Sequence, residues 1–107
     1  MATFVHDGSS IDYTPTINVA AGEVIVQGEL VGVARTPIAA NTLGSLAVEG
    51  VFDFPKESSL SIAVGANCYW NAAASQATTT ATDNTLIGKC IKSASDTDTI
   101  VRVRLSQ

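Results

Sequence analysis

The sequence predicts an all-β domain, built as a small barrel or a sandwich (β-tulip or jelly-roll-like). The first observation is a composition dominated by Ala, Thr, Val, Ser and Gly, with charged residues making up only 15% of the 107 residues. Such a composition has few long helix formers and favours strands. The second is that short β-branched runs are separated by glycines. The third is residues 45–54, which alternate with a period of two, the mark of a strand with one buried face.

The chain is predicted to divide into an extended N-terminal arm, residues 1–16, and a single β domain, residues 17–107. The arm has no sustained hydrophobic period, and Pro15 disfavours helix at Thr14. It nevertheless holds four large apolar side chains: Phe4, Val5, Ile11 and Tyr13. A solvated tail would not normally carry them, so we expect them to bury against a partner or against their own domain.

Three strands are expected within residues 22–54, at 24–26, 30–34 and 45–54. In the third strand the side chains predicted to face the core are Leu46, Val48, Phe52 and Phe54. Those predicted to face outward are Ser45, Ala47, Glu49, Val51 and Asp53. Gly32 and Gly50 lie inside strands, where glycine indicates a bulge, a bend or a close approach of two backbones.

The same pattern returns in the second half of the chain. Residues 22–26 resemble 65–70, residues 29–34 resemble 85–90, and residues 45–51 have a counterpart in 99–105. This indicates a degenerate duplication of a three-strand unit, with chance likeness between glycine-punctuated strands as the alternative.

Three further segments of the second half have a predicted structure. A strand is expected at 67–71, where Tyr69 and Trp70 point to opposite faces, so one ring should lie in the core and the other at a surface or an interface. Residues 72–84 are low in complexity and predict an exposed loop or a loose hairpin. In the last strand, residues 99–105, the alternation places Arg102 and Arg104 outward.

The charge of the chain and its lack of membrane-directing segments limit the kinds of partner that we expect. The formal net charge is −4, and the six basic residues look scattered along the sequence, with only Arg102 and Arg104 close together. This argues against nucleic acid as a direct partner. Neither a signal peptide nor an apolar run of about 20 residues is present, so no membrane partner is expected.

Cys68 and Cys90 are predicted to be buried free thiols, with a disulfide as the alternative.

No set of residues with catalytic or metal-binding spacing is found, so we predict no enzyme activity, cofactor or metal. His6 lies near Asp7, Ser9 and Ser10, but residues in one arm lack the rigid scaffold that a nucleophilic triad needs. Asp96 and Asp98 provide too few oxygen ligands for a calcium loop. No glycine-rich stretch has the pattern of a phosphate-binding loop.

Several motifs, taken in order, resemble the small capsid cement (decoration) proteins of tailed bacteriophages. They are Gly22 before a β run, Leu30-Val-Gly-Val-Ala34, Gly50-Val-Phe-Asp-Phe-Pro55, Gly65 with Tyr69-Trp70, Leu86-Ile-Gly88, and an alternating strand ending at Leu105. The resemblance covers nearly the whole chain after the arm. Lys89-Cys90 departs from it, because small apolar residues are more usual there.

The resemblance implies a structural virion protein, made in the host cytoplasm, that binds the outer surface of an icosahedral capsid. It would stabilise the capsid by bridging major capsid protein subunits, as a homotrimer or alternatively a dimer. Candidate contacts to the capsid or to another subunit are Phe4, Val5, Ile11, Tyr13, Tyr69 and Trp70. The alternatives are another β-rich virion module, for head completion or the tail, and a recombination-related nucleic-acid protein. Some family members were labelled recombinases, but an ATP-driven recombinase needs a phosphate loop.

Overall fold

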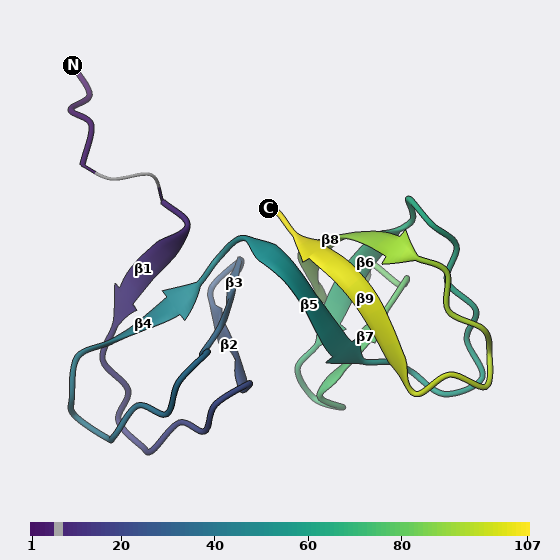
Figure 1. Cartoon of the computed structure of the whole chain (residues 1–107), viewed down its shortest axis with the longest axis horizontal. Helices are drawn as coiled ribbons and strands as arrows, with labels where there is room; N and C mark the ends of the chain where they lie inside the picture. The colour runs from purple at the N-terminus through teal and green to yellow at the C-terminus, as the bar shows by residue number, and fades with distance from the viewer. Residues whose placement is uncertain (6–7) are drawn as a thin grey trace.

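The computed structural model describes residues 1–5 and 8–107, which form nine strands and no α-helix. The strands make two antiparallel sheets that lie side by side, one toward each end of the molecule (Figure 1). The predicted all-β class is therefore confirmed. The arrangement is sandwich-like, and neither sheet closes into a barrel.

The first sheet has four strands in the order β1-β4-β3-β2. Their bounds are β1 Ser10–Tyr13, β2 Val24–Gln27, β3 Leu30–Val33 and β4 Gly44–Ala47. A small core of Val19, Ala34, Ile38 and Leu46 covers this sheet, and Ile11, Tyr13 and Ile25 pack against it.

The second sheet has five strands in the order β5-β9-β8-β6-β7. Their bounds are β5 Gly50–Pro55, β6 Asn67–Asn71, β7 Gln76–Thr78, β8 Thr85–Lys92 and β9 Ile100–Leu105. The larger core lies here, around Phe54 and Trp70, whose ring centroids are 5.9 Å apart. Val33 of β3 belongs to the same core, and Val24 and Val26 of β2 pack against it. The two sheets therefore share one continuous apolar contact.

The two sheets repeat one topology. Strands β1, β4, β3 and β2 take the same order as β5, β9, β8 and β6, and β7 is an addition at the edge. Val19 and Ile38 exchange two backbone hydrogen bonds of 2.8 and 2.9 Å, and Ile62 and Ala94 exchange two of 2.9 Å in the second half.

The glycines that precede the second strand of each unit, β2 and β6, are also equivalent. Gly22 has a φ of 87° and donates to the carbonyl of Ala34, while Gly65 has a φ of 88° and donates to the carbonyl of Cys90. The duplicated unit therefore contains four strands, one more than the sequence pattern indicated.

The prediction of a single strand over residues 45–54 is wrong. β4 ends at Ala47, β5 begins at Gly50, and the two belong to different sheets. Gly50 has a φ of 123°, a conformation that favours glycine and lets the chain turn from one sheet to the other. The alternation is therefore interrupted, and Ala47, predicted to face outward, is only 2% exposed.

Part of the segment predicted as an arm is a strand of the first sheet. β1 pairs with β4 along its whole length, from Ser10 opposite Ala47 to Tyr13 opposite Gly44. Just beyond β1, the carbonyl of Pro15 accepts a hydrogen bond of 2.8 Å from the backbone of Asn41. Residues 1–5 precede this strand and extend away from both sheets (Figure 1).

Candidate functional site

The six predicted contact residues do not form one cluster. Phe4 and Val5 are 79% and 83% exposed. Ile11 and Tyr13 are half-buried and pack against the core of the first sheet. On β6, Tyr69 is half-buried, whereas Trp70 is 6% exposed and its ring lies in the larger core. Of the six, Phe4 and Val5 present the most surface to a partner.

A second candidate surface lies at one end of the first sheet, and we call it the uncharged end. It consists of residues 13–22 and 36–48, which contain no charged side chain. Besides the Val19–Ile38 pair, hydrogen bonds join these segments from Asn41 to the carbonyl of Pro15 and from the backbone of Ala40 to Asn18 Oδ1 at 2.9 Å.

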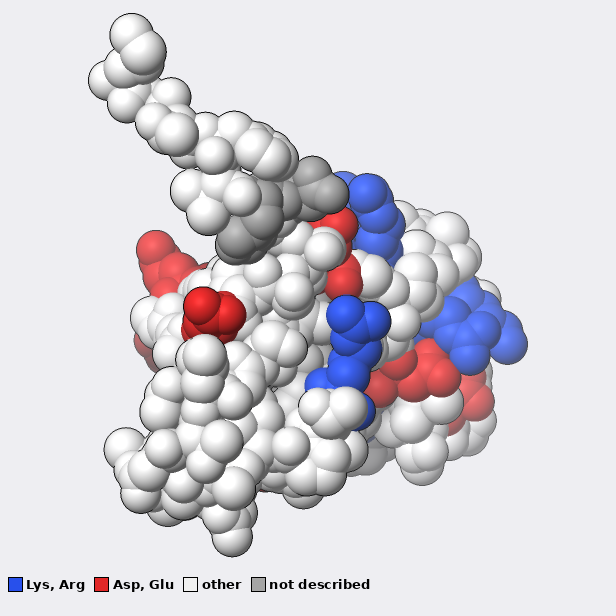
Figure 2. All heavy atoms as spheres, turned by 60° about the vertical axis from the view of Figure 1, so that its left-hand side comes forward, with Lys and Arg blue, Asp and Glu red and all other residues white. Residues whose placement is uncertain are grey.

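The uncharged end carries apolar groups in an exposed position. Ile17 is 71% exposed and Leu43 is 67% exposed. In Figure 2 the lower left of the visible face is free of charged side chains. Since charged residues are depleted from the cores of protein interfaces, this end has the chemistry of a contact surface.

A third surface is formed by strand pairing that the sequence did not reveal. Lys89 lies opposite Arg104, and Lys92 lies opposite Arg102, across the β8–β9 pair. We call these four exposed residues the basic face. The description of the basic residues as scattered is therefore wrong, because antiparallel pairing closes a gap of up to 15 positions in the sequence.

One cation of the basic face has an acidic partner. Arg102 donates two hydrogen bonds to the carboxylate of Asp53, of 2.9 and 3.1 Å. The bond to Arg102 lowers the pKa of Asp53 below its ordinary value, and the same contact raises the pKa of Arg102. Among the described residues Arg104 makes no ion pair.

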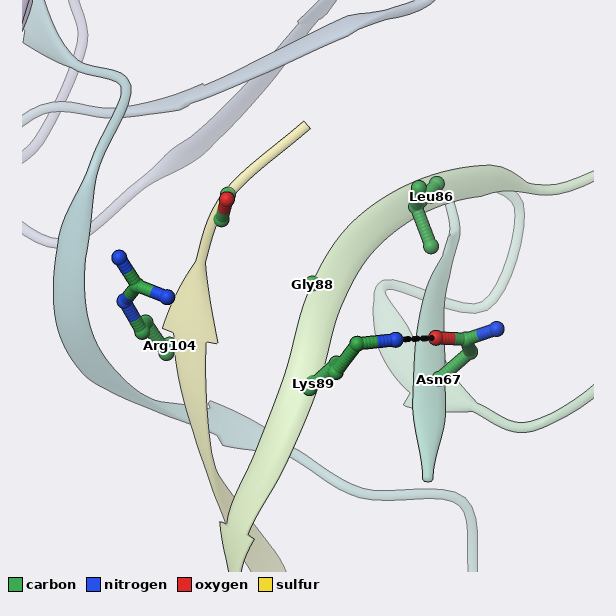
Figure 3. Close-up of a pocket in the computed structure, with 6 residues that line it drawn as sticks. Asn67, Leu86, Gly88, Lys89 and Arg104 are labelled. Atoms are coloured by element: carbon green, nitrogen blue, oxygen red, sulfur yellow. Dashed lines mark hydrogen bonds between the residues drawn. The ribbon is translucent and has the colours of Figure 1, made fainter. Parts of the chain in front are cut away.

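A shallow hollow of about 100 Å³ lies beside Arg104 and Lys89. Figure 3 shows Gly88 and Lys89 in succession on β8 and Arg104 on the neighbouring strand β9, with Lys89 Nζ donating to Asn67 Oδ1 at 2.7 Å. The backbone of Gly88 forms part of the lining of the hollow and packs closely against the carbonyl of Arg104. The hollow offers hydrogen-bond donors and positive charge to an anionic group.

The two cysteines are free and buried, as predicted. Burial, with a smaller contribution from the nearby thiol of Cys90, raises the pKa of Cys68 to about 11. A thiol that holds its proton so firmly is a poor nucleophile, so Cys68 packs as a small apolar group.

The alkaline limit of stability should depend on Cys68. Its pKa is about 11 in the folded protein, against an ordinary value of 9.0, so between these pH values the folded state binds more protons than the unfolded state. The free energy of unfolding should therefore fall as the pH rises from 9 to 11, by up to about 2–3 kcal/mol.

Urea melts at several pH values would measure this slope in the wild type and in Cys68→Ala. The variant should lose less stability than the wild type between pH 9 and 11. Parallel curves for the two proteins would show that Cys68 does not cause the dependence.

The other sites weighed in the sequence are a catalytic triad around His6 and a metal site. His6 and Asp7 lie outside the described residues. Within the described ranges no group of three or more His, Cys, Asp or Glu is placed to hold a metal ion. Nor does that part of the chain hold a helix long and apolar enough to cross a membrane.

Comparison with known proteins gave one match. The family model described as phage cement protein matches residues 5–105, nearly the whole chain. Neither the curated proteins nor the solved structures contained a match.

Proposed function

The chain belongs to the phage cement protein family, and we propose that it binds the outer surface of an icosahedral capsid and bridges neighbouring major capsid protein subunits. Membership of the family makes it a structural, capsid-associated protein of the virion. The match over residues 5–105 is the observation that carries this proposal.

Bridging requires two contact surfaces that can be occupied at once. The exposed N-terminal residues, with Phe4 and Val5, supply one candidate, because large apolar side chains carry much of the binding energy at interfaces. The uncharged end, with Ile17 and Leu43, supplies the other. The two surfaces are separate segments of the chain, so each can contact a different subunit.

Self-association would strengthen this bridging. A stable interface usually buries about 1,200–2,000 Å² in total, about half of it on each partner, so two such interfaces would take about a quarter of the 6542 Å² accessible surface of one chain. Several linked copies can make up for weak single contacts through effective concentration. We therefore propose a homotrimer on the capsid, with a dimer as the alternative.

Removal of residues 2–5 should weaken capsid binding by about tenfold or more. Losing two apolar anchors of about 1 kcal/mol each is sufficient for this effect. The domain should stay folded, with its free energy of unfolding changed by less than about 0.5 kcal/mol, because β1 starts only at Ser10. Co-sedimentation with capsids that lack the cement protein would measure the binding.

Val64→Ser is the matched control, because Val64 is also apolar and 64% exposed but lies in neither proposed surface. It should bind capsids like the wild type. If the truncated chain also binds like the wild type, the N-terminal residues do not anchor it.

A further inference from the structure

Charge is divided unequally between the two halves of this chain. Residues 1–50 contain five acidic residues and one basic residue, whereas residues 51–107 contain five of each. Of the five basic residues in the second half, Lys56 is only 5% exposed. The remaining four form the basic face. One side of the second sheet is therefore positive, and the half that contains the first sheet is negative.

The basic face places like charges next to each other, which lowers the stability of the sheet. Lys89 and Arg104 are direct cross-strand neighbours, and like charges in that position destabilise a sheet. Asp53 offsets Arg102, but the neighbour of Arg104 on β5 is Val51, which is apolar. A carboxylate supplied from outside would remove this repulsion.

The hollow at Gly88 is suited to such a carboxylate. It is lined by Asn67, Lys89 and Arg104 and has a volume of about 100 Å³, enough for the end of an Asp or Glu side chain. In Figure 3 Lys89 follows Gly88 on β8 and extends toward Asn67, whereas Arg104 lies on the neighbouring strand β9 and extends the opposite way. A guanidinium can hold a carboxylate with two parallel hydrogen bonds, which adds geometric specificity.

The surroundings of the basic face favour a protein partner. Val51 and Ile100 lie on the same side of the sheet as Arg104 and Arg102, and they are 53% and 51% exposed. Ile91, at the irregularity between Cys90 and Lys92, is 42% exposed. Nucleic acid is normally bound by a surface with a large positive excess, whereas this chain has a net charge of −4.

We infer that the basic face binds the acidic half of a second copy of this chain, head to tail. Among the described residues, that half exposes the carboxylates of Asp12, Glu23 and Glu29, and that of Glu49 directly before β5. Since the two surfaces in contact differ, the contact is heterologous and can close into a ring. This association is independent of capsid binding, because both surfaces belong to the chain itself.

Sedimentation equilibrium of the full chain at 50 and 500 mM NaCl would test this inference. The wild type should associate, with a dissociation constant that rises at least tenfold at the higher salt concentration, since exposed charges are screened. Lys89→Glu/Arg104→Glu should weaken association at least tenfold at low salt. Asp83→Lys/Asp96→Lys is the matched control, because these acidic residues lie outside the acidic half, and it should associate like the wild type.

A charge-swap mixture makes the test specific. Glu23→Lys/Glu29→Lys should also fail to associate alone, but mixing it with Lys89→Glu/Arg104→Glu should restore association, because each variant then matches the other. Circular dichroism would establish that both variants are folded.

Three results would overturn the inference: a wild type that is monomeric at 100 µM in low salt, unchanged association of Lys89→Glu/Arg104→Glu, or no recovery in the mixture. Capsid or DNA binding that depends on the basic face of a monomeric chain would likewise assign that face to another partner. A chain that self-associates in this way but fails to bind capsids would contradict the proposed function and leave this inference intact.

Discussion

Gly88→Ala is expected to abolish the native fold. A Cβ atom at this position would lie 1.9 Å from the backbone carbonyl oxygen of Arg104, far inside van der Waals contact. The obstacle is backbone, so no side-chain rotation can relieve it, and β8 would have to separate from β9. These two strands are central in the five-stranded sheet. We expect a loss of more than about 4 kcal/mol, enough to unfold a domain near the lower end of the usual 5–15 kcal/mol of stability.

Gly28→Ala is the control for this substitution. Gly28 also has a positive φ, of 63°, but an added Cβ there meets no atom within 4 Å. Gly28→Ala should lower the free energy of unfolding by only about 1–2 kcal/mol, the penalty for placing alanine at a positive φ. Circular dichroism and urea denaturation would compare the two variants. If Gly88→Ala is as stable as Gly28→Ala, the close approach of β8 and β9 is not as described.

Phe54→Ala should lower the free energy of unfolding by about 3–5 kcal/mol, the usual cost of truncating a buried aromatic side chain. Phe54 is 1% exposed and lies in the larger core. Its ring contacts two others, Trp70 at 5.9 Å and Phe52 at 6.4 Å between centroids. Removing it would leave a cavity between the β5 and β6 strands.

Phe52→Ala should lower the free energy of unfolding clearly less than Phe54→Ala, although the sequence pattern predicted that both side chains face the core. Phe52 is only half-buried and packs at the edge of the core. Urea melts of the two variants would rank them. Equal losses, or a larger loss for Phe52→Ala, would mean that the core is centred elsewhere.

Local patterns were sufficient to predict much of the fold. β2, β3, β6, β8 and β9 lie where β-branched or alternating runs between glycines predicted strands. The break between β4 and β5 could not be predicted from alternation, because Leu46 and Phe54 both face inward but toward different cores. β1 has only four residues and lies in a segment that lacks a sustained hydrophobic period, so the alternation there was too short to predict a strand.

The candidate surfaces were less predictable because they depend on contacts between distant residues. Phe4 and Val5 could be singled out from composition alone. The basic face needed the register of β8 against β9, which places Lys89 beside Arg104. The uncharged end could have been predicted from the sequence, since residues 13–22 and 36–48 contain no charged side chain. Their pairing through Val19 and Ile38, however, is a tertiary contact.

The central claim, that this chain cements a phage capsid, is tested most directly by a cryo-EM map of the mature particle. The proposed function predicts density for two small antiparallel β-sheets on the outer surface, in hundreds of copies, at places where neighbouring major capsid protein subunits meet. Density for this chain only at the head–tail junction or in the tail, or an outer shell without it, would contradict that claim.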